Sequence, residues 1–234
     1  METIKKNIKA IIFDMDGTII KTEHIWIEGT FIFLAKHTNA DISQEAVKKF
    51  VHSLAGHSQF SVARHLYDYL KGTWRKEDIQ EKRLACVREA LANQTSTLYI
   101  EGFEDFHRQL REHQMPSCIA TNATIEGLMH YADKMGFHDI FGKHLYSISH
   151  VNLVAKPDPA VFLHAAQQLG VDPSECVVFE DSNAGFQAAK AAGMKCIAIK
   201  NDINGEHLHQ VHGVIDDYRQ ALDALRTLSG LHRD

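Results

Sequence analysis

The sequence lacks a long apolar segment. None of its apolar runs approaches the roughly 18 residues that a membrane-spanning helix needs. The first residues, METIKKNIKAIIF, are interrupted by lysines and do not form the apolar stretch of a secretory signal. These two absences predict a cytoplasmic protein without a membrane partner.

Cysteine is scarce, and its spacing disfavours the common cysteine centres. The four cysteines form no Cys-x-x-Cys pair, which argues against a zinc ribbon or a thioredoxin-type centre. Reduced, mostly buried thiols are the expected state in a cytoplasmic protein. Only 4 prolines are present, so no proline-rich linker marks a domain boundary.

A basic excess is also missing. The chain carries 25 Lys and Arg against 30 Asp and Glu, for a formal net charge of −5. Proteins that bind nucleic acid non-specifically normally show an excess of basic residues, so we expect no nucleic-acid partner. No GxxxxGK[ST] segment occurs, which disfavours a P-loop kinase. The balance still allows a local basic pocket for a small anion.

What the sequence does contain is an alternation of strand-like and helix-like segments. Its 234 residues suffice for one large domain or two small ones. Short apolar runs typical of buried strands lie at 9–13, 117–120, 145–148, 176–179 and 196–199. Amphipathic helical patterns lie between and after them, at 102–113, 125–135, 159–169, 182–192 and 217–228. This alternation predicts an α/β fold, with a parallel sheet and helices on both faces.

One segment breaks the alternation. Residues 22–95 are almost wholly helix-patterned and separate the first predicted strand from the second. We therefore expect an α/β core made of residues 1–21 and 96–234, with a helical insertion over residues 22–95.

Acidic pairs follow two of the predicted strands. Asp14 and Asp16 follow the first, and Glu180 and Asp181 follow the strand CVVF. In an open parallel sheet the ligand crevice lies beyond these carboxyl ends, and neighbouring carboxylates there can bind Mg²⁺ or act as nucleophile and acid/base. Each pair alone also suits an Asp-Gly turn or a helix N-cap. Two acidic pairs in one crevice repel each other unless a cation lies between them.

Two further segments offer groups suited to an anion. Thr121 and Asn122 follow the strand SCIA, where a hydroxyl and an amide can donate hydrogen bonds. Lys156, in KPDP just before a helical pattern, can bring a positive charge to a phosphate. Taken alone, both segments are also typical of surface turns.

The order of these segments resembles that of the haloacid dehalogenase superfamily. FDMDGT, IATN, the lysine of KPDP and FEDSNAG are similar to its four motifs, from Ala10 to about Met194. The resemblance implies a Rossmann-like core with an inserted helical cap. The cap position is that of the β-phosphoglucomutase-like and phosphoglycolate phosphatase-like branch. Lys21 departs from the pattern, because most relatives have an acidic residue there.

The resemblance also implies a role for each motif residue. Asp14 would be the nucleophile that forms an aspartyl phosphate, and Asp16 the general acid and base. Thr121, Asn122 and Lys156 would hold the phosphoryl group. Mg²⁺ would be the cofactor. Its ligands would be the carboxylates of Asp14 and Asp181 and the backbone carbonyl of Asp16, with Glu180 as a direct or water-bridged helper.

Several activities within the superfamily remain as alternatives. Asp16 favours phosphoryl transfer over halide removal, because a halide leaving group needs no proton. Phosphonate-cleaving members need a Schiff-base lysine from the cap. Mutase relatives carry a histidine where this chain has Trp26 and an arginine where it has Gln59, which weakens the mutase interpretation. A catalytically idle, phosphate-binding regulatory protein is the alternative outside the enzymes.

Cap residues would read the substrate. Glu23 and Trp26 resemble positions of the sugar-phosphate phosphatases in this branch, and the segment with His57 and Ser58 resembles the cap loop that faces the active site. We therefore predict a Mg²⁺-dependent phosphatase of a small phosphorylated sugar or polyol. We expect this metabolite to be its partner and the protein to be a monomer.

Overall fold

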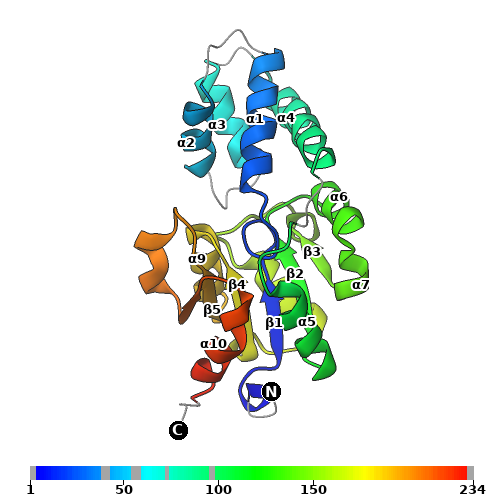
Figure 1. The fold of residues 1–234 in the computed structure, drawn as a ribbon, viewed down its shortest axis with the longest axis vertical. Helices are drawn as coiled ribbons and strands as arrows, with labels where there is room; N and C mark the ends of the chain where they lie inside the picture. Colours follow the sequence, from blue (N-terminus) through cyan, green and yellow to red (C-terminus); the bar gives the residue numbers. More distant parts are fainter. Residues whose placement is uncertain (1–3, 38–42, 54–58, 72–73, 95–97, 231–234) are drawn as a thin grey trace. The chain divides into compact units, whose positions relative to one another are not determined.

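The protein divides into two compact units (Figure 1). The computed structural model describes residues 4–37, 43–53, 59–71, 74–94 and 98–230. One unit comprises Met1–Ile20 and Tyr99–Asp234, and the other comprises Lys21–Leu98. The second unit is slightly longer than the expected 22–95, because backbone pairing continues at its ends. Ile20 forms a bridge with Tyr99, and the Lys21 amide donates to the Leu98 carbonyl at 2.7 Å.

A parallel sheet forms the centre of the first unit. Within the described residues it has six strands, in the order β3-β2-β1-β4-β5-β6. They are β1 (Ala10–Phe13), β2 (Ser117–Thr121), β3 (Leu145–Ser147), β4 (Cys176–Glu180), β5 (Lys195–Ile199) and β6 (Gly213–Ile215). The order changes direction around β1, and ligands of such sheets bind at that point, beyond the carboxyl ends of the strands.

The sequence predicted five of these strands and missed β6. Its three residues begin with a glycine, and Val214 is 43% exposed. Such a short, half-open edge strand leaves no apolar run that a pattern can detect. The other strands are buried along nearly their whole length, as expected for a sheet covered on both faces.

Helices follow the strands of the α/β unit. The α-helices are α5 (Phe103–Glu112), α6 (Ile125–Met135), α7 (Phe137–Phe141), α8 (Ala160–Leu169), α9 (Asn183–Ala191) and α10 (Ala221–Leu228). Short 3₁₀ helices are η1 (Ile4–Lys6), η2 (Ile148–Val151), η3 (Pro173–Glu175), η4 (Gly205–Gln210) and η5 (Tyr218–Gln220). The expected helix over 159–169 begins one residue late, because Pro159 is its N-cap rather than its first residue.

The two faces of the sheet bury different side chains. On one face, Ala10 and Ile12 join alanines and Phe162 and Phe186 of α8 and α9. On the other face, Phe13 belongs to a cluster of aromatic rings and lies 5.4 Å from Phe179, between ring centroids. Phe103, Phe106 and Tyr218 also belong to this cluster. Because side chains alternate along β1, the strand is packed on both faces. This packing fixes the position of Asp14, which follows it.

The second unit is helical. Its helices are α1 (Glu23–His37), α2 (Gln44–His52), α3 (Gln59–Tyr69) and α4 (Lys76–Ala92). Apolar side chains from all four, among them Phe33, Val47, Leu66 and Ile79, form a separate core. Helices α1 and α4 approach most closely at Gly29, where an added Cβ would overlap the backbone of Val87.

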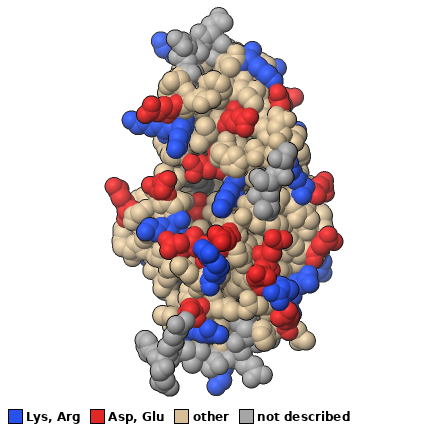
Figure 2. Space-filling model, in the orientation of Figure 1, with Lys and Arg blue, Asp and Glu red and all other residues tan. Residues whose placement is uncertain are grey.

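Basic and acidic side chains are interspersed on the face drawn in Figure 2. All four cysteines are buried and reduced, as the sequence predicted. Within the described residues, no helix combines the length and the apolar character required to cross a membrane.

Candidate active site

Predicted site residues meet at the carboxyl ends of the central strands. Asp14 directly follows β1, and its amide donates to the Phe179 carbonyl at 3.0 Å. Glu180 ends the neighbouring strand β4. Lys156 comes from the loop between η2 and α8, and its ammonium lies between these two carboxylates. Residues from three distant parts of the sequence are thereby brought to one point.

Lys156 forms a buried double ion pair. Its Nζ donates to Asp14 Oδ1 at 2.5 Å and to Glu180 Oε1 at 2.8 Å. The ammonium also lies 4.5 Å from the centroid of the Phe162 ring. The Lys156 and Glu180 side chains are each 1% exposed, and that of Asp14 is 10% exposed. Asp14 is therefore the most exposed of the three side chains.

The Glu180 carboxylate accepts hydrogen bonds from the two residues that follow it. Oε2 accepts from the Asp181 amide at 2.8 Å, the Ser182 amide at 2.7 Å and the Ser182 hydroxyl at 3.0 Å. Gly185 leaves room for it, because a Cβ at this position would overlap the carboxylate. Ser182 also caps α9 by accepting from the Gly185 amide at 3.1 Å. The N-cap interpretation of this segment is thus correct, and the same segment also brings the acidic pair of Glu180 and Asp181 to the end of β4.

Burial and mutual repulsion alter the acidity of the site. Burial is the main cause that raises the pKa of Asp14 to about 7, helped by the negative charge of Glu180 and opposed by Lys156. Burial alone would lower the pKa of Lys156, but the two carboxylates outweigh it and raise that pKa. The raised pKa of Lys156 thus comes from the two carboxylates that share it, whereas repulsion from Glu180 only adds to the effect of burial on Asp14.

Asp181 adds to this negative charge. Burial, followed by the charges of Glu180 and Asp14, raises its pKa well above the ordinary value. The Thr18 hydroxyl lies 3.5 Å from Asp181 Oδ1. Gly17, at φ +76°, allows the turn after β1 to approach the Asp181 carboxylate, because a Cβ on Gly17 would overlap Asp181 Oδ2. Asp16 lies in the same turn, and its charge contributes to the raised pKa of Asp181.

Tyr218, which supports this turn, was not among the residues predicted from the sequence. Tyr218, 2% exposed, donates from its hydroxyl to the Thr18 carbonyl at 2.9 Å. Burial and the charges of Asp14 and Asp181 raise its pKa well above the usual range, so it stays a protonated donor. Its ring belongs to the aromatic cluster beneath Phe13. The only sequence signal is an aromatic residue at the start of the last helical pattern, which equally suits an ordinary core position.

The residues present fit a magnesium ion. Among the described residues, no three His, Cys, Asp or Glu side chains form a closed metal cage. Mg²⁺ does not need one, because it usually takes one or two carboxylates together with water and substrate phosphate. The mutually repelling carboxylates of Asp14, which is buried, and Asp181, which is half-buried, are such a donor set, with the Asp16 carbonyl nearby in sequence.

Thr121 and Asn122 support the site from β2. Thr121 is 2% exposed, and its hydroxyl oxygen accepts from the Ala123 amide at 3.1 Å. Asn122 Oδ1 accepts from the backbone amide of Lys156 at 2.9 Å. The side-chain oxygen of Asn122 therefore fixes the loop that carries Lys156. The sequence could not reveal this contact.

The predicted cap residues occupy the helical unit. Glu23, at the start of α1, contacts His52 at the end of α2, with 2.5 Å between Oε1 and Nε2. Trp26 lies on α1, and the guanidinium carbon of Arg83 is 4.9 Å from its ring centroid. His57 and Ser58 lie outside the described residues.

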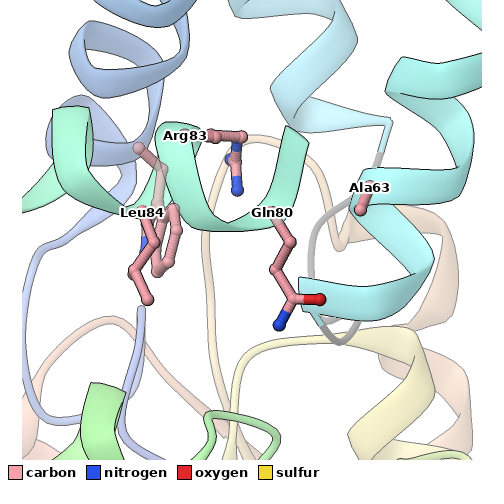
Figure 3. A pocket seen from close by; sticks show the side chains of 5 residues that line it. Ala63, Gln80, Arg83 and Leu84 are labelled. Carbon is pink, nitrogen blue, oxygen red and sulfur yellow. The ribbon is translucent and has the colours of Figure 1, made fainter. Parts of the chain in front are cut away.

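A pocket within the helical unit contains one of these residues. It is lined by Trp26, Ala63, Gln80, Arg83 and Leu84, from α1, α3 and α4 (Figure 3). Arg83 is only 7% exposed, and its Nε donates to the Thr30 hydroxyl at 2.9 Å. Sequence analysis missed Arg83. The available signal was its position four residues after Ile79, on the apolar side of α4.

Known proteins resemble the chain along most of its length. The family model for haloacid dehalogenase-like hydrolases matches residues 8–193. YhcW of Bacillus subtilis (strain 168) is 28% identical over 219 residues, covering 93% of this chain and 92% of its own. The fructose-1-phosphate phosphatase YqaB of Escherichia coli (strain K12) is 28% identical over 205 residues. The match covers 82% of this chain and 96% of YqaB. A crystal structure of β-phosphoglucomutase from Clostridium difficile shares the fold, with a TM-score of 0.79 at 22% identity and coverage of 94% and 98%.

Proposed function

The chain belongs to the haloacid dehalogenase-like hydrolases and is a phosphoric monoester hydrolase, and we propose that it uses Asp14 as a nucleophile on a small sugar or polyol phosphate. The observation that carries this proposal is the double ion pair. A buried carboxylate at the end of the central strand lies against a buried lysine, and the carboxylate is the more exposed of the two, at 10% against 1%.

The chemistry proceeds in two displacements. In the first, a bond forms between an Asp14 oxygen and phosphorus while the bond to the leaving oxygen breaks, and Asp16 gives that oxygen a proton. In the second, Asp16 takes a proton from water, whose oxygen attacks phosphorus and releases Asp14. The products are the free alcohol and inorganic phosphate.

Charge balance explains the composition of the site. Two unit charges 4 Å apart repel by about 1 kcal/mol in bulk water and by more in a closed site, so an anionic Asp14 needs cations to approach a phosphate. Lys156 supplies one of them. Mg²⁺, when bound by the Asp14 and Asp181 carboxylates and the Asp16 carbonyl, supplies the charge that stabilises the transferring phosphoryl group.

The remaining motif residues have supporting roles. Thr121 and Asn122 are expected at the phosphoryl oxygens, and Asn122 also fixes the Lys156 backbone. Glu180, whose carboxylate accepts four hydrogen bonds from the chain, holds Lys156 and the start of α9. Because these bonds occupy its oxygens, Glu180 is expected to assist the metal site through its position or through a bridging water.

The substrate class rests on the helical unit. Glu23 and His52, paired at the ends of α1 and α2, are polar groups of the kind that hydrogen-bond substrate hydroxyls. YqaB, one of the relatives, is a fructose-1-phosphate phosphatase. Both observations support a small polyhydroxylated substrate for this chain.

A cytoplasmic location and a monomeric state are further expectations for this protein.

Phosphate release from a generic aryl phosphate tests the proposal. The wild type should release phosphate only with Mg²⁺, and Asp14→Asn should reduce the rate by roughly 10³-fold or more. Asp202→Asn, an exposed aspartate, is the control and should behave like the wild type. Activity that survives Asp14→Asn would refute the nucleophile, and no activity in the wild type would favour an idle phosphate-binding protein.

A panel of sugar phosphates, phosphoglycolate and nucleotides then tests the substrate class. Sugar or polyol phosphates should give the highest kcat/KM, and Trp26→Ala and His57→Ala should change the relative preferences. Interconversion of sugar phosphate isomers faster than phosphate release would identify a mutase instead.

A further inference from the structure

Two asparagines that no motif includes lie against Asp181. Asn201 and Asn204 belong to the loop between β5 and η4, beyond the residues that the family model matches. Asn204 is 2% exposed, which is rare for an amide side chain unless its hydrogen bonds are satisfied.

The two asparagines fix each other's amide orientation. Asn201 Oδ1 accepts from the amides of Ile203 at 3.0 Å and Asn204 at 2.9 Å, and Asn204 Oδ1 accepts from the Asn201 amide at 3.1 Å. Because each oxygen is occupied by a backbone donor, each Nδ2 is left to donate elsewhere.

Both Nδ2 groups donate to Asp181. Asn201 Nδ2 lies 3.1 Å from Asp181 Oδ2 and 3.2 Å from its carbonyl oxygen. Asn204 Nδ2 donates to the same carbonyl at 2.9 Å and to the Ile199 carbonyl at 2.8 Å. Asn201 therefore holds the carboxylate, while Asn204 ties the Asp181 backbone to the end of β5.

We propose that Asn201 is a positioning residue that holds the Asp181 carboxylate ready for Mg²⁺, with Asn204 as the anchor of the loop that carries it. The inference rests on the proposed function, since it assumes that Asp181 is a metal ligand.

The surroundings of Asp181 explain why such support is needed. Glu180, Asp14 and Asp16 all repel its carboxylate, which without a restraint would be driven away from them. A lysine or arginine in place of Asn201 would hold the carboxylate but also neutralise it, and would compete with the metal. An amide N–H fixes its direction and leaves its charge available. Partners of metal ligands of this kind typically change metal affinity by about 10–100-fold when they are removed.

Mg²⁺ titration calorimetry on the metal-free full-length protein is the test. Asn201→Ser keeps an oxygen for the Ile203 and Asn204 amides but removes the donor to Asp181. It should raise the Kd for Mg²⁺ by about 10-fold, and saturating Mg²⁺ should restore most of kcat. Asp202→Asn changes the charge of the same loop without touching Asp181 and should leave the Kd unchanged. Asn204→Ser should instead lower the Tm of the metal-free protein, because it removes the side-chain donor to the Ile199 carbonyl and leaves the Asp181 carbonyl with Asn201 alone.

The outcomes separate this inference from the proposed function. A Kd for Asn201→Ser within twofold of the wild type, in a protein that binds Mg²⁺ and releases phosphate, would overturn the positioning role alone. An equal rise in Asp202→Asn would also overturn it. A wild type that neither binds Mg²⁺ nor releases phosphate would overturn the proposed function. Should Asn201→Ser fail to fold, Asn201→Thr, which likewise keeps the oxygen and loses the donor, is interpreted by the same criteria.

Discussion

The candidate site makes the metal-free protein less stable, and replacing its nucleophile should stabilise it. Asp14 is 7% exposed and shares one lysine with Glu180, while Asp181 and Asp16 add further negative charge. Asp14→Asn keeps the size and an oxygen acceptor for Lys156 but removes a charge that is disfavoured by burial and by repulsion from Glu180. Above pH 7 the variant should therefore be more stable than the wild type.

The size of the effect follows from the acidity of Asp14. Its pKa is raised from 3.8 to about 7, and the difference, at about 1.4 kcal/mol for each pKa unit, corresponds to about 4 kcal/mol at most. A raised folded-state pKa means that the folded protein binds the proton more tightly than the unfolded chain. The associated stability is present below about pH 4 and is lost as the pH rises through about 7. Asparagine does not titrate, so the stability of the variant relative to the wild type should increase over this same pH range.

Thermal unfolding of both proteins without metal, from pH 4 to pH 8, measures this difference. At pH 8 the limit of about 4 kcal/mol corresponds to a Tm higher by roughly 8–16 °C for the variant. Mg²⁺ should narrow the gap, because a bound cation offsets the repulsion in the wild type. Equal Tm values at pH 8, or a variant that is less stable at every pH, would refute the reasoning about excess negative charge.

Three further substitutions test single contacts. Lys156→Met removes the buried cation and should lower the rate of phosphate release by roughly 10²–10³-fold at saturating Mg²⁺; a rate near that of the wild type would contradict its role. Gly185→Ala places a methyl group where the Glu180 carboxylate lies and should destabilise the protein by about 1–3 kcal/mol in urea unfolding. Gly205→Ala is the control, because Gly205 faces open space, and it should leave the stability unchanged. Tyr218→Phe leaves the buried Thr18 carbonyl without its donor and should cost about 1–3 kcal/mol in the same assay; an unchanged unfolding midpoint would remove it from the support of the turn.

The sequence was sufficient for the fold class and for the residues at the strand ends. Asp14, Lys156 and Glu180 could be predicted because each follows a recognisable strand or precedes a helix, and parallel strands bring their carboxyl ends together. The structure adds the contact between them, in which one ammonium serves two carboxylates.

What the sequence could not supply are contacts that depend on packing between distant segments. Tyr218 reaches the turn after β1 only because the last helical segment packs beneath it. Asn201 and Asn204 lie in a short polar stretch, NDIN, which as a sequence indicates only a turn. Arg83 meets Trp26 only because α1 and α4 pack closely at Gly29.

Trapping the phosphorylated enzyme tests the central claim most directly. The wild type is mixed with Mg²⁺ and a substrate that carries a radiolabelled phosphoryl group, quenched in acid during turnover and digested. The account predicts label on the peptide that contains Asp14, removable by hydroxylamine as expected for an acyl phosphate, and none in Asp14→Asn. Label on another residue, or rapid phosphate release in which no labelled protein ever accumulates even in a burst, would contradict it.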